Sequence, residues 1–294
     1  MQKLVECVPN FSEGKDLSLV DDIVSAVKTA KVLDVHSDPD HNRTVVTILG
    51  DPQAVSKAAF DLCERAMQLL DIRQHEGAHP YIGVVDVIPF VPIKGIDVRE
   101  TVKLARDFGK RVAAELALPV YFYGEAAKIP ARRELPDVRH GGYHLLREEI
   151  DKPHRKPDSG KSLHPSAGAV AVGVRDFLIA YNVNLNTRDL DIAKSIAKNI
   201  REKSGGLPGV RALGIELASK GITQVSINII NHKMTSLKKV FNAVKKWAKE
   251  YKVEIPESEI VGLVPKEAVF EGMEEYLMLP VFGENHILEN HQPA

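Results

Sequence analysis

The stretch VLDVHSDPDHNRTVVTILGDP, residues 32–52, contains two apolar runs, a polar loop between them and the beginning of a helix. The runs at 32–38 and 43–50 are rich in Val, Ile, Leu and Thr, which is typical of strands. Asp51 can cap a helix, and Pro52 suits the first helical position. The stretch therefore predicts two strands followed by a helix.

The residues on either side extend this pattern. A strand is expected at 4–10 and a helix at 17–30, where apolar residues recur at helical spacing. The helix after Asp51 should run to about Leu70, and a fourth strand is expected at 84–93. The N-terminal part of the chain thus reads strand, helix, strand, strand, helix, strand.

The same order of elements recurs further along the chain. Strands are expected at 177–185, 210–218, 222–230 and 259–265, and helices at 190–204 and 236–251. Both runs are βαββαβ, the order of the ferredoxin-like split motif. The expected fold class is α/β (α+β), with two ferredoxin-like βαββαβ lobes that form a cleft. The expected lobes are residues 1–174 and 175–294.

A third region separates the two repeats. It contains an expected helix at 98–117, an expected strand at 120–124 and a long piece without regular structure at 125–168. Long irregular segments in compact proteins are usually functional or disordered. The composition fits a disordered linker and a binding loop laid between the lobes equally well.

The bulk composition is that of an ordinary globular protein. The chain has 294 residues, of which 44% are hydrophobic and 27% charged, and its net charge is −1. Neither a nucleic-acid nor a membrane partner is indicated, because the charge is balanced and no apolar run approaches the roughly 18 residues of a membrane span. The N-terminus lacks the apolar stretch of a signal peptide, so a cytoplasmic location is expected.

Residues 75–79, HEGAH, match the H-E-x-x-H spacing of zinc proteases. That motif binds zinc because a helix places positions i and i+4 on one face. Here Gly77 weakens a helix, and Pro80 disfavours helical backbone at His79. A zinc site is therefore disfavoured. A solvated polar loop and a catalytic or binding loop that needs only His79 both stay open.

Polar side chains gather where the first two strands end. The residues concerned are Asn10, Ser12 and Glu13 after the first strand, and His36, Asp38, Asp40 and His41 around the end of the second. Polar groups between apolar strands often form sites, but the same residue types also build turns. Both interpretations stay open for each loop taken alone.

Five stretches together resemble the glutamate formimidoyltransferase family, which also forms the N-terminal half of formimidoyltransferase-cyclodeaminase. They are LVECVPNFSEG (4–14), LDVHSDPDHNRTV (33–45), HEGAHPYIGVVDVIPFVPIKG (75–95), VYFYGEAA (120–127) and NVNLNTRDLDIAKSIAKNIRE (182–202). The resemblance spans nearly the whole chain in order. It implies two ferredoxin-like lobes with a folate in the cleft between them, and a chain without the cyclodeaminase half.

The resemblance also implies an activity. The family transfers a formimino group from N-formimino-L-glutamate to N5 of tetrahydrofolate in histidine degradation, which gives 5-formiminotetrahydrofolate and L-glutamate. Tetrahydrofolate is then a cosubstrate, with no metal and no permanently bound cofactor. The implied partners are these small molecules and a second subunit in a homodimer. One sheet face of each lobe is uncovered by its helices, and we expect it to meet the other lobe or that subunit.

Family motifs point to particular residues. The histidine before the proline, here His79, is implied to be catalytic, and unperturbed histidine titrates at about pH 6.5, close to neutrality. Asp38 is a candidate for stabilising the cationic intermediate. Further candidate substrate contacts are Asn10, His36 and Arg43. The segment 157–168 matches the family's folate loop. Its candidate contacts are Gly160, Lys161, Ser162, Leu163, His164, Pro165, Ser166, Ala167 and Gly168.

Two positions depart from the family pattern. Tyr81 stands where members usually have arginine, and His36 stands where animal members have aspartate. Both departures concern contacts to the substrate carboxylates. The alternatives are formyl transfer between N-formylglutamate and 5-formyltetrahydrofolate, a non-catalytic folate-binding module, and a zinc hydrolase. The presence of His79 argues against the inert module.

Overall fold

The stretch at 32–52 folds as a hairpin followed by a helix. In this computed structural model, which describes residues 2–292, β3 (Lys31–Asp38) pairs antiparallel with β4 (Arg43–Gly50). Helix α2 (Pro52–Leu69) begins directly afterwards. The Asp51 side chain accepts a hydrogen bond from the amide of Gln53 at 2.9 Å, as expected for an N-cap.

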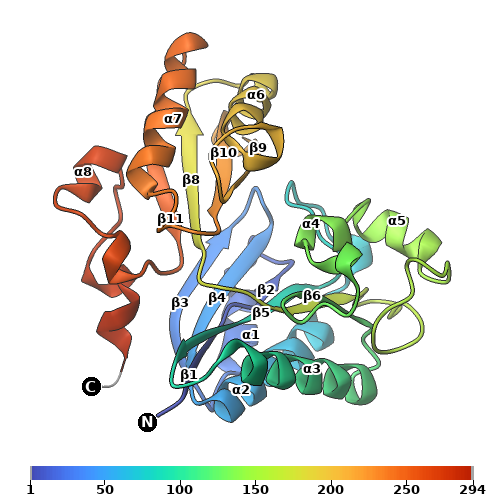
Figure 1. The fold of residues 1–294 in the computed structure, drawn as a ribbon. Helices are drawn as coiled ribbons and strands as arrows, with labels where there is room; N and C mark the ends of the chain where they lie inside the picture. Colours follow the sequence, from blue (N-terminus) through green and yellow to red (C-terminus); the bar gives the residue numbers. More distant parts are fainter. Residues whose placement is uncertain (1, 293–294) are drawn as a thin grey trace. The chain divides into compact units, whose positions relative to one another are not determined.

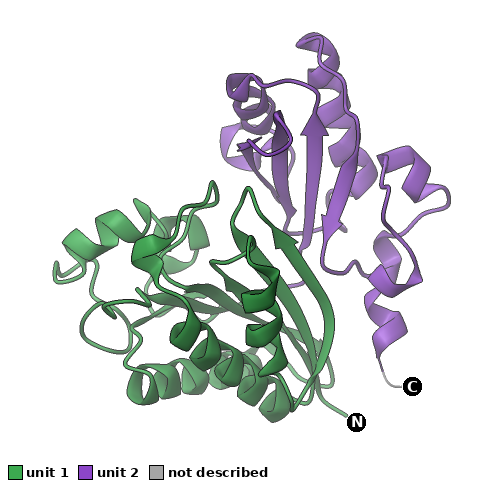
Figure 2. Cartoon of the chain, turned by 180° about the vertical axis from the view of Figure 1, so that it is seen from behind, with its two compact units in different colours: residues 1–175 green, residues 176–294 purple. Residues whose placement is uncertain are grey.

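Two units, residues 1–175 and residues 176–294, make up the chain (Figure 2). Each has its own sheet, of seven and four strands in the described residues, and its own hydrophobic core. The predicted two-lobe α+β class is confirmed.

In the first sheet, the predicted N-terminal strand forms two short strands separated by a break. Strands β1 (Leu4–Cys7) and β2 (Asn10–Phe11) both lie between β4 and β5 (Val85–Lys94), antiparallel to each. The first strand of the βαββαβ run therefore lies between the third and the fourth. Beyond β5 the sheet continues through β7 (Val170–Val174) to β6 (Val120–Gly124), and both of these pairings are parallel.

Helices cover both faces of this sheet (Figure 1). One face buries the main core against α1 (Leu17–Ser25), α2 and α3 (Val98–Glu115). The other face packs Tyr121 and Tyr123 of β6 against Val138 and Leu146, which come from the segment expected to be irregular.

That expectation was wrong over part of residues 125–168. The segment contains a 3₁₀ turn (Pro130–Arg132) and two short helices, α4 (Leu135–Val138) and α5 (Gly142–Glu149). Helices this short are unstable alone and form because they pack on other elements. The disordered-linker interpretation therefore does not hold here. The strand β7 directly after the segment was also not predicted.

The second unit contains one antiparallel sheet and two main helices. Its elements are β8 (Ile179–Leu185), α6 (Leu190–Ile200), β9 (Val210–Leu217), β10 (Ile222–Ile229), α7 (Leu237–Glu250) and β11 (Ser258–Val261). The antiparallel strands lie in the order β11-β8-β10-β9, so the first strand is again between the third and the fourth. The last strand ends earlier than expected because Gly262 turns the chain at φ +79°.

Short elements complete the described chain. They are α8 (Met273–Leu277) and the 3₁₀ turns Ile72–Gln74, Glu202–Ser204, Lys266–Ala268, Glu284–His286 and Leu288–His291. No helix within residues 2–292 has both the length and the apolar character needed to cross a membrane.

The face of the second sheet opposite α6 and α7 carries polar side chains on its central strands. Along β8, Tyr181 and Val183 belong to the core, whereas Asn182 and Asn184 alternate with them. Asn182 donates to Glu259 at 2.9 Å, and Gln224 donates to Asn184 at 2.9 Å. The same face also carries the apolar residues Leu213, Ile215 and Leu217 of β9, since Ile215 is the register partner of Gln224. The expectation that this face meets the first lobe or a second subunit stays a prediction.

Candidate active site

The HEGAH stretch lies in a loop before β5 and contains no helix. His75 and His79 are therefore not on one helical face, which is the geometry that the zinc motif requires. A Cβ on Gly77 would lie 2.4 Å from the carbonyl oxygen of His41. Glycine is thus required at this position because the loop before β4 approaches closely.

Both ends of this loop are attached to one piece of chain. The amide of Ile72 donates to the carbonyl of Ser166 at 2.8 Å, and the amide of Val84 donates to that of Ala167 at 2.9 Å. Residues 166–169 therefore run beside both ends of the His79 loop. The structure brings together two predicted site segments that are far apart in the sequence.

His79 is half-buried and its ring is oriented by the backbone. Its Nδ1–H donates to the carbonyl oxygen of Pro80 at 2.8 Å, a tautomer that leaves the lone pair on Nε2. Burial holds the pKa of His79 well below its ordinary value, and the charges of Arg43, Arg139 and His41 act in the same direction. The imidazole is therefore neutral at pH 7 and can accept a proton at Nε2.

Asn42 joins the loops around His79. Its backbone is left-handed at φ +47°, a region that asparagine tolerates. The side-chain oxygen accepts from the amide of Gly14 at 3.0 Å, and the side-chain nitrogen donates to the carbonyl of Glu76 at 2.9 Å. Asn42 was not among the predicted site residues, although an Asn between two polar loops is a recognisable turn signal.

A buried ion-pair cluster lies under the same loops. The Asp86 carboxylate, at the start of β5, is fully buried and pairs with Arg43 at 2.8 Å. Arg139, which follows α4, donates to the same carboxylate through Nε at 3.2 Å and through Nη2. The amide of Ile82 donates a further bond at 3.1 Å. Neither Asp86 nor Arg139 was predicted from the sequence.

The four residues predicted to contact the substrate or to stabilise the intermediate have defined positions on or near β4. Asn10 accepts from Arg43 Nε at 3.1 Å, so these two predicted residues are in direct contact. Asp38 accepts from the amides of Asp40 and His41 at 2.8 and 2.7 Å, which is turn chemistry. His36 lies within β3, half-buried and opposite Val45.

The predicted folate segment divides into an exposed part and a buried part. Gly160, Lys161, Ser162 and Pro165 are exposed, whereas Ala167 and Gly168 are buried and Leu163, His164 and Ser166 are half-buried. His164 Nδ1 accepts from the amides of Ser166 and Ala167 at 3.3 and 3.0 Å, and therefore stabilises the turn. Gly168 has φ +74°, and a Cβ there would lie 2.5 Å from the Ile82 carbonyl oxygen.

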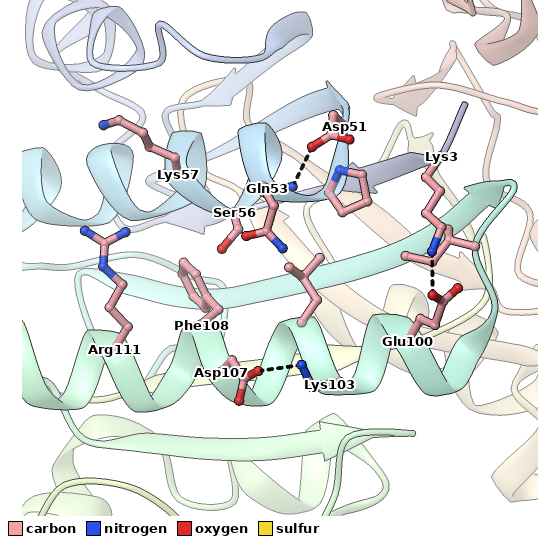
Figure 3. Close-up of a pocket in the computed structure, with 13 residues that line it drawn as sticks. Lys3, Asp51, Gln53, Ser56, Lys57, Glu100, Lys103, Asp107, Phe108 and Arg111 are labelled. Carbon is pink, nitrogen blue, oxygen red and sulfur yellow. Dashed lines mark hydrogen bonds and ion pairs between the residues drawn. The ribbon is translucent and has the colours of Figure 1, made fainter. Parts of the chain in front are cut away.

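A separate pocket of about 570 Å³ lies between α2 and α3 (Figure 3). Leu104 and Phe108 line it together with Lys3, which pairs with Glu100 at 2.5 Å, and with charged residues of both signs. None of the predicted site residues lines this pocket.

The fold and the site define an α+β protein with a candidate histidine acid–base site in its first unit. The model of the N-terminal subdomain of the formiminotransferase domain matches residues 4–175, and that of the formiminotransferase domain matches residues 180–289. The chain belongs to the formiminotransferase family, as the five motifs indicated.

Relatives of the chain carry consistent names. A glutamate formimidoyltransferase from Thermoplasma acidophilum is 46% identical, with 97% of this chain and 96% of the relative covered. One from Streptococcus pyogenes serotype M1 is 40% identical, with 99% of both chains covered. The formimidoyltransferase-cyclodeaminase of Rattus norvegicus is 41% identical, and the match covers 94% of this chain but 53% of the rat protein.

Proposed function

We propose that the chain is a glutamate formimidoyltransferase. It transfers the formimino group of N-formimino-L-glutamate to N5 of tetrahydrofolate and releases L-glutamate and 5-formiminotetrahydrofolate. The proposal is supported by two relatives of that name, which match nearly the full length at 46% and 40% identity. Tetrahydrofolate is a cosubstrate that enters and leaves with each turnover, and the reaction belongs to histidine degradation.

His79 performs the proton transfers in this proposal. N5 of tetrahydrofolate attacks the formimino carbon and gives its proton to Nε2 of the neutral imidazole. The resulting imidazolium protonates the nitrogen of the leaving glutamate, which restores the neutral base. The observation that supports this role is the hydrogen bond from His79 Nδ1–H to the Pro80 carbonyl, since it fixes the ring with the Nε2 lone pair available.

Some of the remaining predicted residues hold the loops in place, and others are proposed to contact the substrates. The exposed part of the folate segment, Gly160–Ser162 and Pro165, is proposed to contact the pteridine and its benzoyl linker. The buried residues of that segment hold it against the His79 loop. Arg43 binds substrate, with Asn10 as its hydrogen-bond partner. Asp38 fixes the turn before His41 and stabilises the cationic intermediate through charge alone.

Product analysis tests this function. Purified protein is incubated with N-formimino-L-glutamate and tetrahydrofolate, and both products are quantified by mass spectrometry. We expect L-glutamate and 5-formiminotetrahydrofolate in equal amounts. Release of glutamate with no modified folate would mean hydrolysis, and would overturn the transferase.

The cytoplasm is the proposed location and a homodimer the proposed assembly. The homodimer rests on the family resemblance. Light scattering tests it, and a mass near 32.5 kDa, that of one chain, at micromolar concentration would contradict it.

A further inference from the structure

The Arg43–Asp86–Arg139 cluster has more positive than negative charge. The single carboxylate of Asp86 accepts ion-paired hydrogen bonds from both guanidinium groups. Side-chain exposure is 0% for Asp86, 7% for Arg43 and 13% for Arg139. One unit of positive charge is therefore left without a counter-charge in a largely buried position.

A buried charge without a partner is unfavourable, because burial removes its hydration. Arg43 shows this effect: burial lowers its pKa to about 10, the Asp86 carboxylate opposes the shift, and the charge of Arg139 adds to it. An anion that binds next to the two guanidinium groups would supply the missing negative charge and stabilise them.

The excess charge acts electrostatically on the candidate base. Both Arg43 and Arg139 act on the pKa of His79, although they come from β4 and from the residue after α4. The hydrogen bonds and ion pairs of Arg43 use its Nε and Nη1 atoms, and those of Arg139 use its Nε and Nη2 atoms. These bonds do not use the Nη2 group of Arg43 or the Nη1 group of Arg139, and both groups can donate to a ligand.

We propose that Arg43 and Arg139, oriented by the Asp86 carboxylate, bind a carboxylate of the formimino donor beside His79. This inference rests on the proposed function, since it names the group that holds the amino-acid substrate. A carboxylate suits the site because guanidinium groups bind it through paired, charge-assisted hydrogen bonds. Folate also carries carboxylates in its glutamate part, and the experiment must separate the two sources.

Arg139→Gln is the informative variant. It removes the excess charge but leaves Asp86 paired with Arg43 and with the Ile82 amide, so no buried carboxylate is left alone. We expect the KM for N-formimino-L-glutamate to rise at least about tenfold, the effect of one charge-assisted hydrogen bond. The KM for tetrahydrofolate should change less than twofold. Arg139→Lys should restore part of the loss.

Arg133→Gln is the matched control. Arg133 is on the same segment, is 62% exposed and pairs with Glu125 instead of Asp86. Both KM values should stay unchanged in this variant. A rise in the KM for tetrahydrofolate with an unchanged KM for the donor in Arg139→Gln would overturn the assignment, because the bound carboxylate would then be that of folate.

Binding of L-glutamate alone separates this inference from the proposed function. Calorimetric titration should give an affinity at least about tenfold weaker for Arg139→Gln than for the wild type. If the wild type binds glutamate through Arg139 but transfers no formimino group, the transferase proposal is wrong and the carboxylate site stands. If turnover is normal and neither KM nor glutamate affinity depends on Arg139, the carboxylate site is wrong and the transferase stands.

Discussion

The imidazole rings of His41 and His79 lie 6.0 Å apart between centroids, at an interplanar angle of 30°. His41 is in the polar loop between β3 and β4, and His79 is in the loop before β5. The charge of a protonated His41 disfavours a second charge on His79, in addition to burial and the two guanidinium groups. The site therefore keeps His79 in the neutral form that a general base requires.

The pH dependence of kcat/KM follows from this environment. Only unprotonated His79 can accept a proton, and its lowered pKa keeps it unprotonated to pH values below its ordinary 6.5. Activity should therefore persist below pH 6.5 and fall at more acidic pH. His41→Gln removes one neighbouring positive charge, so the acidic limb should move to higher pH. The exposed His144→Gln should leave the limb in place, and equal shifts in both variants would contradict this assignment.

His79 and His75 should differ in their contribution to turnover. His79→Ala should lower formimino transfer at least about 10²-fold, the smaller effect expected for a lost acid–base group, while circular dichroism stays that of the wild type. His75 contacts Tyr81 edge-on at 4.4 Å, so His75→Ala should affect packing and cost much less activity. Equal losses in the two variants, or loss of wild-type turnover on addition of chelator, would argue for a metal site.

Gly168 should resist substitution more than another glycine with positive φ. At Gly142, φ is +62° and a Cβ would meet only the Tyr81 carbonyl oxygen at 3.4 Å, so Gly142→Ala should cost about 1–2 kcal/mol for the left-handed backbone. Gly168→Ala carries the same penalty and adds a 2.5 Å approach to Ile82. Urea unfolding of the first unit should show a loss at least about 1 kcal/mol larger for Gly168→Ala. Equal losses would mean that 166–169 is not held tightly against the His79 loop.

Folate should protect the exposed part of the segment 157–168. Lys161 is exposed and is a tryptic site, whereas Ala167 and Gly168 are already buried. Cleavage after Lys161 should slow when tetrahydrofolate is present, and cleavage after the exposed Lys203 of the second unit should not. If the rate at Lys161 is the same with and without folate, this part of the segment does not bind it.

Hydrophobic periodicity accounts for the part of the fold that the sequence predicted. The order of strands and helices in both repeats follows from apolar residues at alternate or helical spacing, such as the alternation of Tyr181 and Val183 with Asn182 and Asn184. Strand β7 was missed because all five of its residues are buried, so the strand has no alternation. Helices α4 and α5 were missed because packing on β6, and not their own sequence, stabilises them.

The candidate site was predictable only in part for a similar reason. Local patterns and the family resemblance located His79, Asn10 and Arg43, but residues 43, 86 and 139 are joined only by the tertiary fold. A single acidic residue within the apolar run VVDVIPF indicates that Asp86 needs a buried partner. One sequence does not reveal that the partners are Arg43 and Arg139.

The most direct test of the proposed reaction compares two donors under the same conditions. The kcat/KM of the wild type is measured with N-formimino-L-glutamate and with N-formyl-L-glutamate, each at saturating tetrahydrofolate. The family relationship predicts a higher kcat/KM with the formimino donor than with the formyl donor. A higher kcat/KM for the formyl donor, or no transfer from either donor to tetrahydrofolate, would contradict the account.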